Sequence, residues 1–349
     1  MDRDHPDHTT DASIKDIAQA LGVSHSTVSR ALNDSALISE ATRERVKALA
    51  AEMGYIPNAV ARSLKAQRSG TVGLVLTSLT DPFFADVMAG VDTVAGDAGL
   101  SMFIAASHNE PEREMEIIET FHRRRVDGII VAASRLGSRY RDRLARIQVP
   151  IVLVNQHAEE SPGFHAVAFD ELAGARLAVE HLVSKGHRRI GYLGLGNRQR
   201  SNALRLQGYQ EVLAEAGIRP GAGWVHVVSE ADIDVQDDTI VGERTLPAVL
   251  DSGVTALFCY NDRVAMGVLL ACRQHDVIVP RDLNLVGFDD LELARWASPP
   301  LTTIQQPRTA MGSAAMRLML DLLEGHGGQD CLLAPLLIER ASTAAPGGS

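Results

Sequence analysis

The chain has 349 residues, 45% of them hydrophobic, which is enough for two or three packed domains. Its formal net charge is −10, no apolar run approaches the ~20 residues of a membrane span, and the acidic start MDRDHPDHTTDAS is unlike a signal peptide. The three cysteines, Cys259, Cys272 and Cys331, lack CxxC or zinc-finger spacing, and an odd number is a poor disulfide framework. We therefore expect buried thiols in a cytoplasmic protein.

Residues 1–12 are polar and acidic, and we expect them to be a disordered tail. His5 and His8 lie among aspartates in this tail. Because no fixed scaffold would hold the two imidazoles in the geometry that a metal requires, we predict no metal site there.

The stretch IKDIAQALGVSHSTVSRALN, from Ile14 to Asn33, predicts two short helices that meet at a tight corner. Ser13 and Asp16 predict a capping box at the start of the first helix, with apolar residues at helical spacing behind it. Gly22 then supplies the turn, because glycine adopts a positive φ without a Cβ clash. The pattern is that of a helix-turn-helix, which places its second helix in the DNA major groove.

The second helix has a polar outer face. Ser24 caps this helix, and Val28, Ala31 and Leu32 turn it inward. The candidate DNA-reading face is then formed by His25, Ser26, Ser29 and Arg30, with Thr27 beside them at the N-terminal end. Helical corners with glycine turns also occur in α-rich enzymes and bundles, so this pattern alone leaves both interpretations open.

A third helix, from near Ser39 to Gly54, is expected to complete a small all-α head. Its predicted buried face consists of Val46, Leu49, Ala50 and Met53.

The basic charge of the chain is concentrated in this head. Between residues 13 and 68, eight Lys and Arg outnumber five Asp and Glu, whereas residues 1–70 sum to zero and the remainder carries the whole charge of −10. Only the head therefore suits phosphates. For Arg43, Arg45 and Lys47 taken singly, a solvated helix face is the preferred interpretation.

The segment after the third helix is short. Tyr55, Ile56 and Pro57 end regular structure, and Asn58 can cap AVARSLK, which has good helix formers. Because so few residues cannot hold a helix alone, this segment needs a partner.

The whole opening resembles the lactose-repressor (LacI/GalR) family of bacterial transcription regulators, in GVSHSTVSRALN, TRERVKALAAEMGYIPN and ARSLKAQRSGTVGLVL, and the likeness continues nearly to the C-terminus. The resemblance implies a hinge helix that folds only on DNA, beside that of a dimer partner, with Leu64 entering the minor groove. It also implies that His25 and Ser26 hold the specificity positions. The predicted DNA-binding residues are Ser24, His25, Ser26, Thr27, Ser29, Arg30, Asn33, Asn58, Ala61, Leu64 and Lys65.

From Thr71 the sequence changes to short apolar strands that alternate with helices. The expected strands are TVGLVLT, LSMFIAA, DGIIVAA, PIVLVN and HAVAFDE, then RIGYLG, ALFCYN and LNLVGFD, with helices from Pro82, around 112–125, over 172–185 and over 204–216. This alternation predicts parallel α/β sheets. Two similar halves resemble the periplasmic sugar-binding-protein architecture, in which a ligand cleft lies between two doubly wound subdomains.

The predicted domain order follows from these elements. We expect a helix-turn-helix domain over 13–57, a hinge helix and linker over 58–69, an effector-binding and dimerisation domain over 70–344, and a flexible tail over 345–349. Within the large domain, one subdomain spans about 70–169 and 305–333, and the other about 170–304 and 334–344. The helix over 309–324 and the strand LLIER are expected to cross back between them.

Enzyme motifs are missing where such sheets often carry them. GYLGLGNRQ has Gln199 at the third glycine position of a dinucleotide fingerprint, and no GxxxxGK, HExxH or GxSxG occurs. Asp289 and Asp290 are adjacent at a strand end, where neighbouring side chains point in different directions, so a single ligand contact is expected rather than a catalytic pair. We predict neither catalysis nor a cofactor.

The predicted effector site is taken from the resemblance and judged by its chemistry. Matching residues are Leu79, Asp81, Phe83, Phe84, Asn155, Ser201, Arg205, Asn261, Arg263 and Asp289. Amide, carboxylate and guanidinium groups suit vicinal hydroxyls, and an aromatic ring suits an apolar sugar face. Two alternatives stay open: Arg205 pairs with a neighbouring carboxylate, and Phe83 and Phe84 are ordinary core.

The sequence thus predicts a ligand-responsive repressor that binds a pseudo-palindromic operator as a homodimer, with a sugar as the expected effector. A purine or nucleoside is the main alternative effector. An enzyme with a DNA-binding appendage would need a cofactor fingerprint, and a sugar receptor without a regulatory role would need an export signal.

Overall fold

The computed structural model describes residues 12–55, 68–136, 140–156, 163–229, 231 and 238–346. The chain divides into two compact units, Met1–Ser69 and Gly70–Ser349. The predictions for the N-terminal tail and the hinge, including Asn58, Ala61, Leu64 and Lys65, lie outside the described residues.

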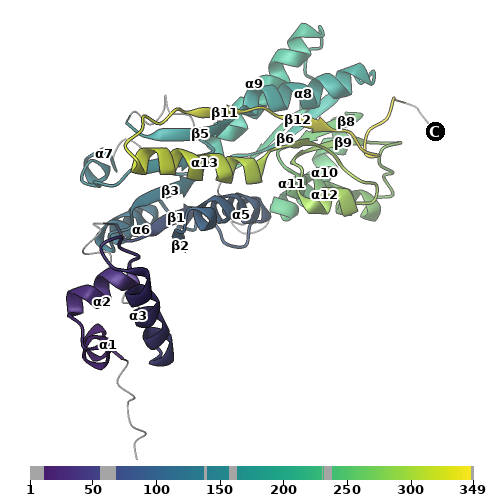
Figure 1. Ribbon diagram of the computed structural model, residues 1–349. Coiled ribbons are helices and arrows are strands. Elements are labelled where there is room, and N and C mark those ends of the chain that lie inside the picture. The colour runs from purple at the N-terminus through teal and green to yellow at the C-terminus, as the bar shows by residue number, and fades with distance from the viewer. Residues whose placement is uncertain are drawn as a thin grey trace, which may run out of the picture. The chain divides into compact units, whose positions relative to one another are not determined.

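The head consists of α1 (Ile14–Leu21), α2 (His25–Leu32) and α3 (Glu40–Glu52) (Figure 1). Ser13 and Asp16 form the expected capping box, and Gly22 ends α1 in the left-handed region at φ 65°. The Ser24 side chain accepts from the Thr27 amide at the start of α2. The predicted helix-turn-helix is therefore confirmed, and local caps and one glycine turn define it.

Three elements supply the small core of the head. Ile17 from α1, Val28 and Ala31 from α2, and Val46 from α3 are fully buried. Because each helix contributes one stripe, the outer face of α2 stays available for contacts outside the head.

The body contains two six-stranded sheets with the same strand order. The first runs β2 (Ser101–Ala106), β1 (Thr71–Leu76), β3 (Gly128–Ala132), β4 (Ile151–Val154), β5 (His165–Phe169) and β11 (Cys331–Leu333). The second runs β7 (Val225–Val228), β6 (Ile190–Leu195), β8 (Ala256–Cys259), β9 (Asn284–Asp289), β10 (Thr302–Gln305) and β12 (Leu336–Ile338). All pairings are parallel except that of β12 with β10. The doubly wound parallel fold is confirmed, with one antiparallel edge strand added.

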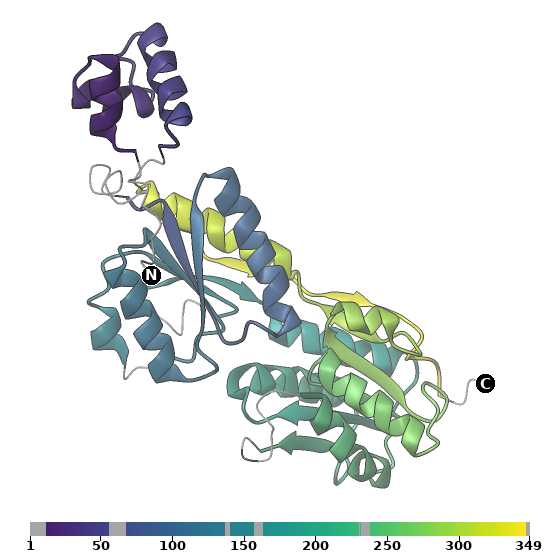
Figure 2. The same ribbon diagram turned by 90° about the horizontal axis from the view of Figure 1, so that it is seen from below.

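Helices cover the sheets and complete two lobes, shown side by side in Figure 2. The first lobe carries α5 (Pro82–Asp97), α6 (Pro111–Arg123), α7 (Arg141–Leu144) and α13 (Arg308–Leu323). The second lobe carries α8 (Glu171–Ser184), α9 (Gln199–Glu215), α10 (Asp238–Asp251), α11 (Asp262–Gln274) and α12 (Glu292–Trp296). Among the described residues, no helix has the length and apolar character that a membrane crossing requires.

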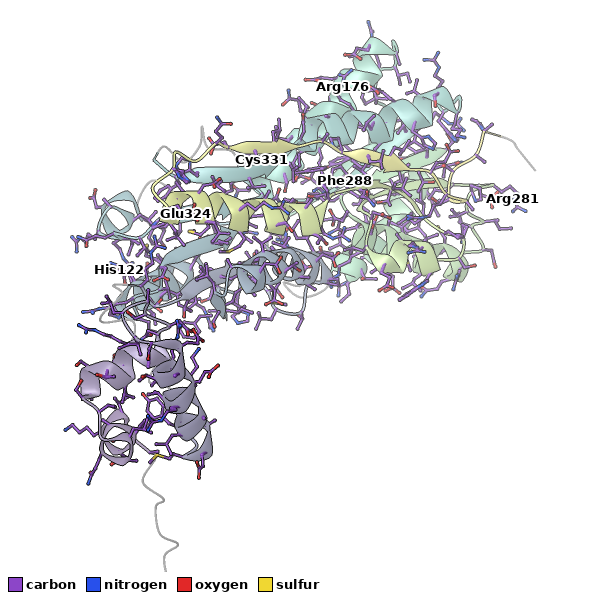
Figure 3. The ribbon with its side chains drawn as sticks, viewed as in Figure 1. His122, Arg176, Arg281, Phe288, Glu324 and Cys331 are labelled. Atoms are coloured by element: carbon purple, nitrogen blue, oxygen red, sulfur yellow. The ribbon has the colours of Figure 1, made fainter. Side chains whose placement is uncertain are left out.

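The chain passes between the lobes three times, after β5, after β10 and between β11 and β12. The first crossing leads into α8, which packs against α9 of the second lobe, and the second leads into α13, which packs against α5 of the first. Arg176 on α8 forms ion pairs with Glu211 and Glu215 of α9 on the outer surface (Figure 3).

The burial of each cysteine depends on the element that contains it. Cys259 in β8 and Cys272 in α11 are buried free thiols, as expected. Cys331 is only half-buried, because β11 is the edge strand of its sheet, so the expectation of burial is wrong for this residue.

Glycines allow two helix pairs to meet backbone to backbone. A Cβ at Gly90 of α5 would overlap the Thr309 carbonyl oxygen of α13, and a Cβ at Gly312 would overlap that of Val87. Gly242 of α10 and Gly267 of α11 form a similar crossing in the second lobe. Each lobe therefore contains a helix pair with no side-chain layer at its closest point.

Substitution of alanine at two glycines of α5 is expected to have opposite effects. Gly90→Ala forces α5 and α13 apart and should lower the free energy of unfolding by about 1–3 kcal/mol. Gly96→Ala adds a methyl group where nothing lies within 4 Å, and should raise it by roughly 0.5–1 kcal/mol through helix propensity. Urea unfolding of both variants measures the difference, and equal effects would contradict the close crossing.

Candidate functional sites: the outer face of α2 and the cavity between the lobes

The outer face of α2 presents the polar residues that the sequence placed there. Ser24, His25, Ser26, Arg30 and Asn33 are exposed, whereas Thr27 and Ser29 are half-buried. The predicted residues of this helix therefore lie together on one side of the head.

Some of these side chains already serve local structure. The Ser24 hydroxyl lies 2.8 Å from the hydroxyls of Ser26 and Thr27, and Asn33 Nδ2 donates to the Ser29 carbonyl at 2.6 Å. Within the described part of the chain, His25 and Arg30 form no side-chain hydrogen bond or ion pair. They are therefore the side chains of this face with donor groups left for a ligand.

The basic residues of α3 behave as a solvated helix face. Arg43 pairs with Glu40, and Lys47 pairs with Asp34 at 2.5 Å. The hydrogen bond from Lys47 lowers the pKa of Asp34. These contacts favour the surface interpretation for Arg43 and Lys47, since exposed pairs of this kind contribute little.

A cavity of about 460 Å³ lies at the carboxyl ends of the strands of both lobes. Nine of the ten predicted effector residues line it: Asp81, Phe83, Phe84, Asn155, Ser201, Arg205, Asn261, Arg263 and Asp289. Leu79 does not, because it lies in the connection before α5 with 59% of its surface exposed. The cavity has the size and position typical of a small-molecule site in doubly wound folds.

A buried arginine forms the floor of the cavity. Arg205 Nε donates to Glu171 Oε2 at 2.7 Å, and Nη2 lies 3.9 Å from Asp289 Oδ1. Arg205 and Glu171 are each 3% exposed. Arg205 therefore pairs with a neighbouring carboxylate, which was one of the alternatives from the sequence. Because both residues line the cavity, this pairing does not remove Arg205 from the predicted site.

Aromatic rings hold this guanidinium in place. The Arg205 Cζ lies 3.7 Å from the Phe288 ring centroid and 4.3 Å from that of Tyr260. Phe288 lies in the interior of the second lobe (Figure 3), and the Tyr260 hydroxyl lies 2.6 Å from that of Ser201. Cation–π contact of this kind favours a buried arginine.

Other predicted residues combine a structural role with a place on the cavity wall. Asp81 caps α5, and Asn261 caps α11 while donating to Asp238 at 2.8 Å. Phe83 and Phe84 meet edge to face at 5.2 Å and also belong to the first-lobe core. The core interpretation and the cavity interpretation therefore both hold for the two phenylalanines.

The sequence interpretation missed several polar residues at the cavity. Buried acceptor oxygens of Asn109, Gln156, Glu171 and Gln306 have no hydrogen-bond donor among the described residues, and all four residues line the cavity. Glu171 lies two residues after β5 and Gln306 directly follows β10, the two strands from which the chain first crosses between the lobes. A polar residue within two positions of the end of such a strand is the signal that would have found them.

Arg308 connects the lobes beside the cavity. Its Nε donates to Asp86 of α5 at 2.8 Å, and its Nη1 and Nη2 donate to the carbonyl oxygens of Asp289 and Asp290 at the end of β9. One side chain therefore joins a first-lobe helix to the strand end that carries a cavity carboxylate.

Known proteins match this chain over both units. Two family models match it: "Bacterial regulatory proteins, lacI family" over residues 13–58 and "Periplasmic binding protein-like domain" over residues 179–343. The ribose operon repressor of Haemophilus influenzae is 36% identical over 335 residues, covering 95% of this chain and 98% of the relative. The repressor PurR of Photobacterium profundum is 33% identical over 334 residues, with coverage of 95% and 98%.

A solved structure extends the likeness to the fold. The Lac repressor dimer bound to operator and the anti-inducer ONPF has a TM-score of 0.86 and 29% identity, covering 96% of this chain and 100% of that one.

Burial predicts an unusual pH dependence for Asp289. Burial raises the pKa of its carboxyl to about 7, although the charges of Arg205 and Arg308 oppose the rise. The folded state therefore keeps a proton that the unfolded state loses above pH ~4, and this stabilising contribution is lost as pH rises through 7.

The free energy of unfolding of the wild type should fall, relative to Asp289→Asn, by about 1 kcal/mol per pH unit between pH 5 and 6.5. Urea unfolding across that range measures the difference. Burial lowers the pKa of His181 and His187, but both proteins contain these histidines, so their contributions cancel. Parallel pH profiles would contradict the raised pKa.

Proposed function

Because this chain belongs to the LacI family of bacterial regulatory proteins, we propose that it is a repressor that binds a pseudo-palindromic operator as a homodimer and responds to a sugar. It is a DNA-binding transcriptional regulator rather than an enzyme. Because bacterial DNA lies in the cytoplasm, we propose that this transcriptional regulator acts there.

The exposed polar face of α2 is the observation that best supports operator binding. His25 and Arg30 project from a helix whose inner side is locked into the head by Val28 and Ala31. Arg30 has the planar fork that grips guanine in the major groove. We propose Asn58, Ala61, Leu64 and Lys65 as hinge contacts on the strength of the resemblance, with Leu64 in the minor groove.

The chemistry of the cavity favours a sugar. Four residues with unpaired acceptor oxygens line it, and each of these oxygens needs a donor such as a ligand hydroxyl. The aromatic rings of Phe83 and Phe84 lie at its wall, where they suit an apolar sugar face. A purine base has amino and ring N–H donors but no hydroxyl group, so we propose it as the less favoured effector.

Control of DNA binding would come from the closure of the two lobes. A ligand shifts a conformational equilibrium only when it binds one state better than the other. Arg308 donates to the Asp289 carbonyl oxygen, and Arg205 lies 3.9 Å from the Asp289 carboxylate, so a ligand at this carboxylate acts on a residue that is also bonded to a first-lobe side chain. We propose that this difference in closure changes the hinges between head and body.

Substitutions on α2 should change operator preference. Replacement of His25 and Ser26 should alter the bases selected from a random operator library, and Arg30→Ala should cost about 1–3 kcal/mol of discrimination. Arg45→Ala, an exposed arginine on α3, is the control for charge alone. If all variants bound the same sequences with uniformly weaker affinity, the face would contact only phosphates.

A thermal-shift screen tests the effector class. Sugars should raise the unfolding temperature of the full-length protein, and Asp289→Ala should remove the shift while the protein remains folded, because the variant lacks a buried acceptor of the cavity. Stabilisation by purines alone would overturn the sugar assignment. The same compounds should change the affinity for operator DNA in a filter or anisotropy assay.

A further inference from the structure

The turn that follows β9 has a strained backbone. Asp289 has a φ of 109° and Asp290 a φ of 52°, in a region that residues other than glycine rarely occupy. Such conformations persist only where the surrounding structure enforces them, and they cluster at functional sites. Asp289 lines the cavity and is 7% exposed, whereas Asp290 is not part of the lining. The contacts that hold this turn therefore also determine where a cavity carboxylate lies.

Asp290 connects the turn to the two neighbouring strands of the second sheet. Its Oδ1 accepts from Arg340 Nη2 at 2.6 Å, and its Oδ2 accepts from Gln305 Nε2 at 2.8 Å. Gln305 ends β10, and Arg340 lies two residues after the end of β12. Arg340 Nη1 also donates to the Leu301 carbonyl oxygen, just before β10, at 2.8 Å. The Asp290 and Arg340 side chains are 11% and 15% exposed, so removal of one partner would leave a poorly solvated charge.

A second carboxylate holds the other end of the turn. Asp262, the first residue of α11, is fully buried, and its Oδ2 accepts from the Leu291 amide at 2.7 Å. Its Oδ1 accepts from the Thr303 hydroxyl of β10 at 2.5 Å. A Cβ at Gly287 of β9 would overlap this Oδ1, so the glycine leaves the space that the carboxylate occupies. Two carboxylates outside the cavity lining therefore fix the turn from both sides.

The orientation of the Asp289 carboxylate depends on its own backbone. Gln306 Nε2 donates to its Oδ1 at 2.7 Å, and Arg308 donates to the carbonyl oxygen of the same residue. Arg205 Nη2 lies 3.9 Å from Oδ1, which is beyond hydrogen-bonding distance. If the turn relaxed to a negative φ, the carboxylate would point in another direction, and these contacts would be lost with it.

We propose that Asp290 and Arg340 are positioning residues of the effector site, because their ion pair, outside the cavity, holds the turn in the conformation that directs the Asp289 carboxylate to the ligand. This inference rests on the proposed function, in which the cavity binds a sugar effector. Asp262 supports the same turn from α11. A carboxylate held in this way needs no rearrangement when a hydroxyl group donates to it, which favours binding.

The pH dependence of unfolding tests the position of Asp289 without a ligand. In Arg340→Gln, release of the turn exposes the Asp289 carboxyl, so its pKa returns toward the ordinary value. The difference between wild type and Asp289→Asn across pH 5–6.5 should therefore shrink by roughly half or more when both proteins also carry Arg340→Gln. A difference of unchanged size would overturn the inference.

This comparison isolates one carboxyl group. The charged and titratable groups that face it are Arg205 of α9, Arg308 of α13, Glu171 of α8, Asp81 at the start of α5 and Asp262 of α11. All of them are present in both members of each pair. A change in the titration of Asp290 after loss of its counterion is likewise common to both, so it cancels.

Arg281→Gln is the matched control. It breaks an ion pair of 2.9 Å with Asp282, which precedes the opposite end of β9. The pH-dependent difference due to Asp289 should keep its wild-type size in this variant. Asp290→Asn is a second test variant, because asparagine keeps the shape of the side chain and tolerates a positive φ. It should reduce the difference in the same direction as Arg340→Gln.

Hydrogen exchange of the wild type needs no variant. The Leu291 amide, which donates to the buried Asp262, should exchange far more slowly than the amides of an exposed loop. Exchange at the rate of unstructured chain would show that the turn is not fixed, and would overturn the inference.

The effector arm uses the neutral monosaccharide that raises the unfolding temperature of the full-length wild type most. Titration calorimetry should show that this sugar binds Arg340→Gln about tenfold more weakly or worse, and binds Arg281→Gln as it binds the wild type. Wild-type affinity in a folded but less stable Arg340→Gln would leave the ion pair only a structural role and overturn the proposal. If no monosaccharide binds the wild type while the pH-dependent difference shrinks, the sugar assignment fails and the positioning of Asp289 stands.

Discussion

The ligand cavity depends on a guanidinium that is removed from water. Arg205 is paired with Glu171, lies near Asp289 and contacts two aromatic rings. Loss of one partner of such a pair leaves an uncompensated buried charge, at a cost of about 3–5 kcal/mol. The pairing therefore links three segments, namely the start of α8, the middle of α9 and the end of β9, and fixes the cavity floor on which the other polar groups are arranged.

Local chemistry explains why the head could be predicted closely from the sequence. Ser13, Asp16, Gly22 and Ser24 act on backbone groups within a few residues of themselves, so their spacing carries the whole signal. The α/β alternation of the body was equally legible, although the short strands β7, β10 and β11 and the helices α10 and α11 were not identified. β7 and β11 are edge strands, and β11 pairs with β5, which is distant in the chain, whereas β10 is a strand of only four residues.

The cavity could be predicted only in part, because its members meet across long separations. The resemblance supplied nine residues of its wall, but the partner of Arg205 lies 34 positions away, and no local pattern marks Glu171 as that partner. Gln156 and Gln306 stand out because their side-chain oxygens are buried without a hydrogen-bond donor. That property arises only in the folded chain, so the sequence does not show it. Leu79 shows the opposite case, in which a position carried over from relatives faces solvent here.

The glycine crossings of α5 with α13 and of α10 with α11 have a mechanical consequence. Where two helix backbones are in contact, no layer of side chains lies between them that could repack. We therefore expect each helix pair to move as one stiff unit. Both crossings lie within a lobe, so neither one holds the two lobes together, and the lobes are joined by the three strand connections. If ligand binding turns one lobe relative to the other about these connections, the stiff helix pair of the first lobe would help to pass that rotation on to Gly70, where the lobe begins.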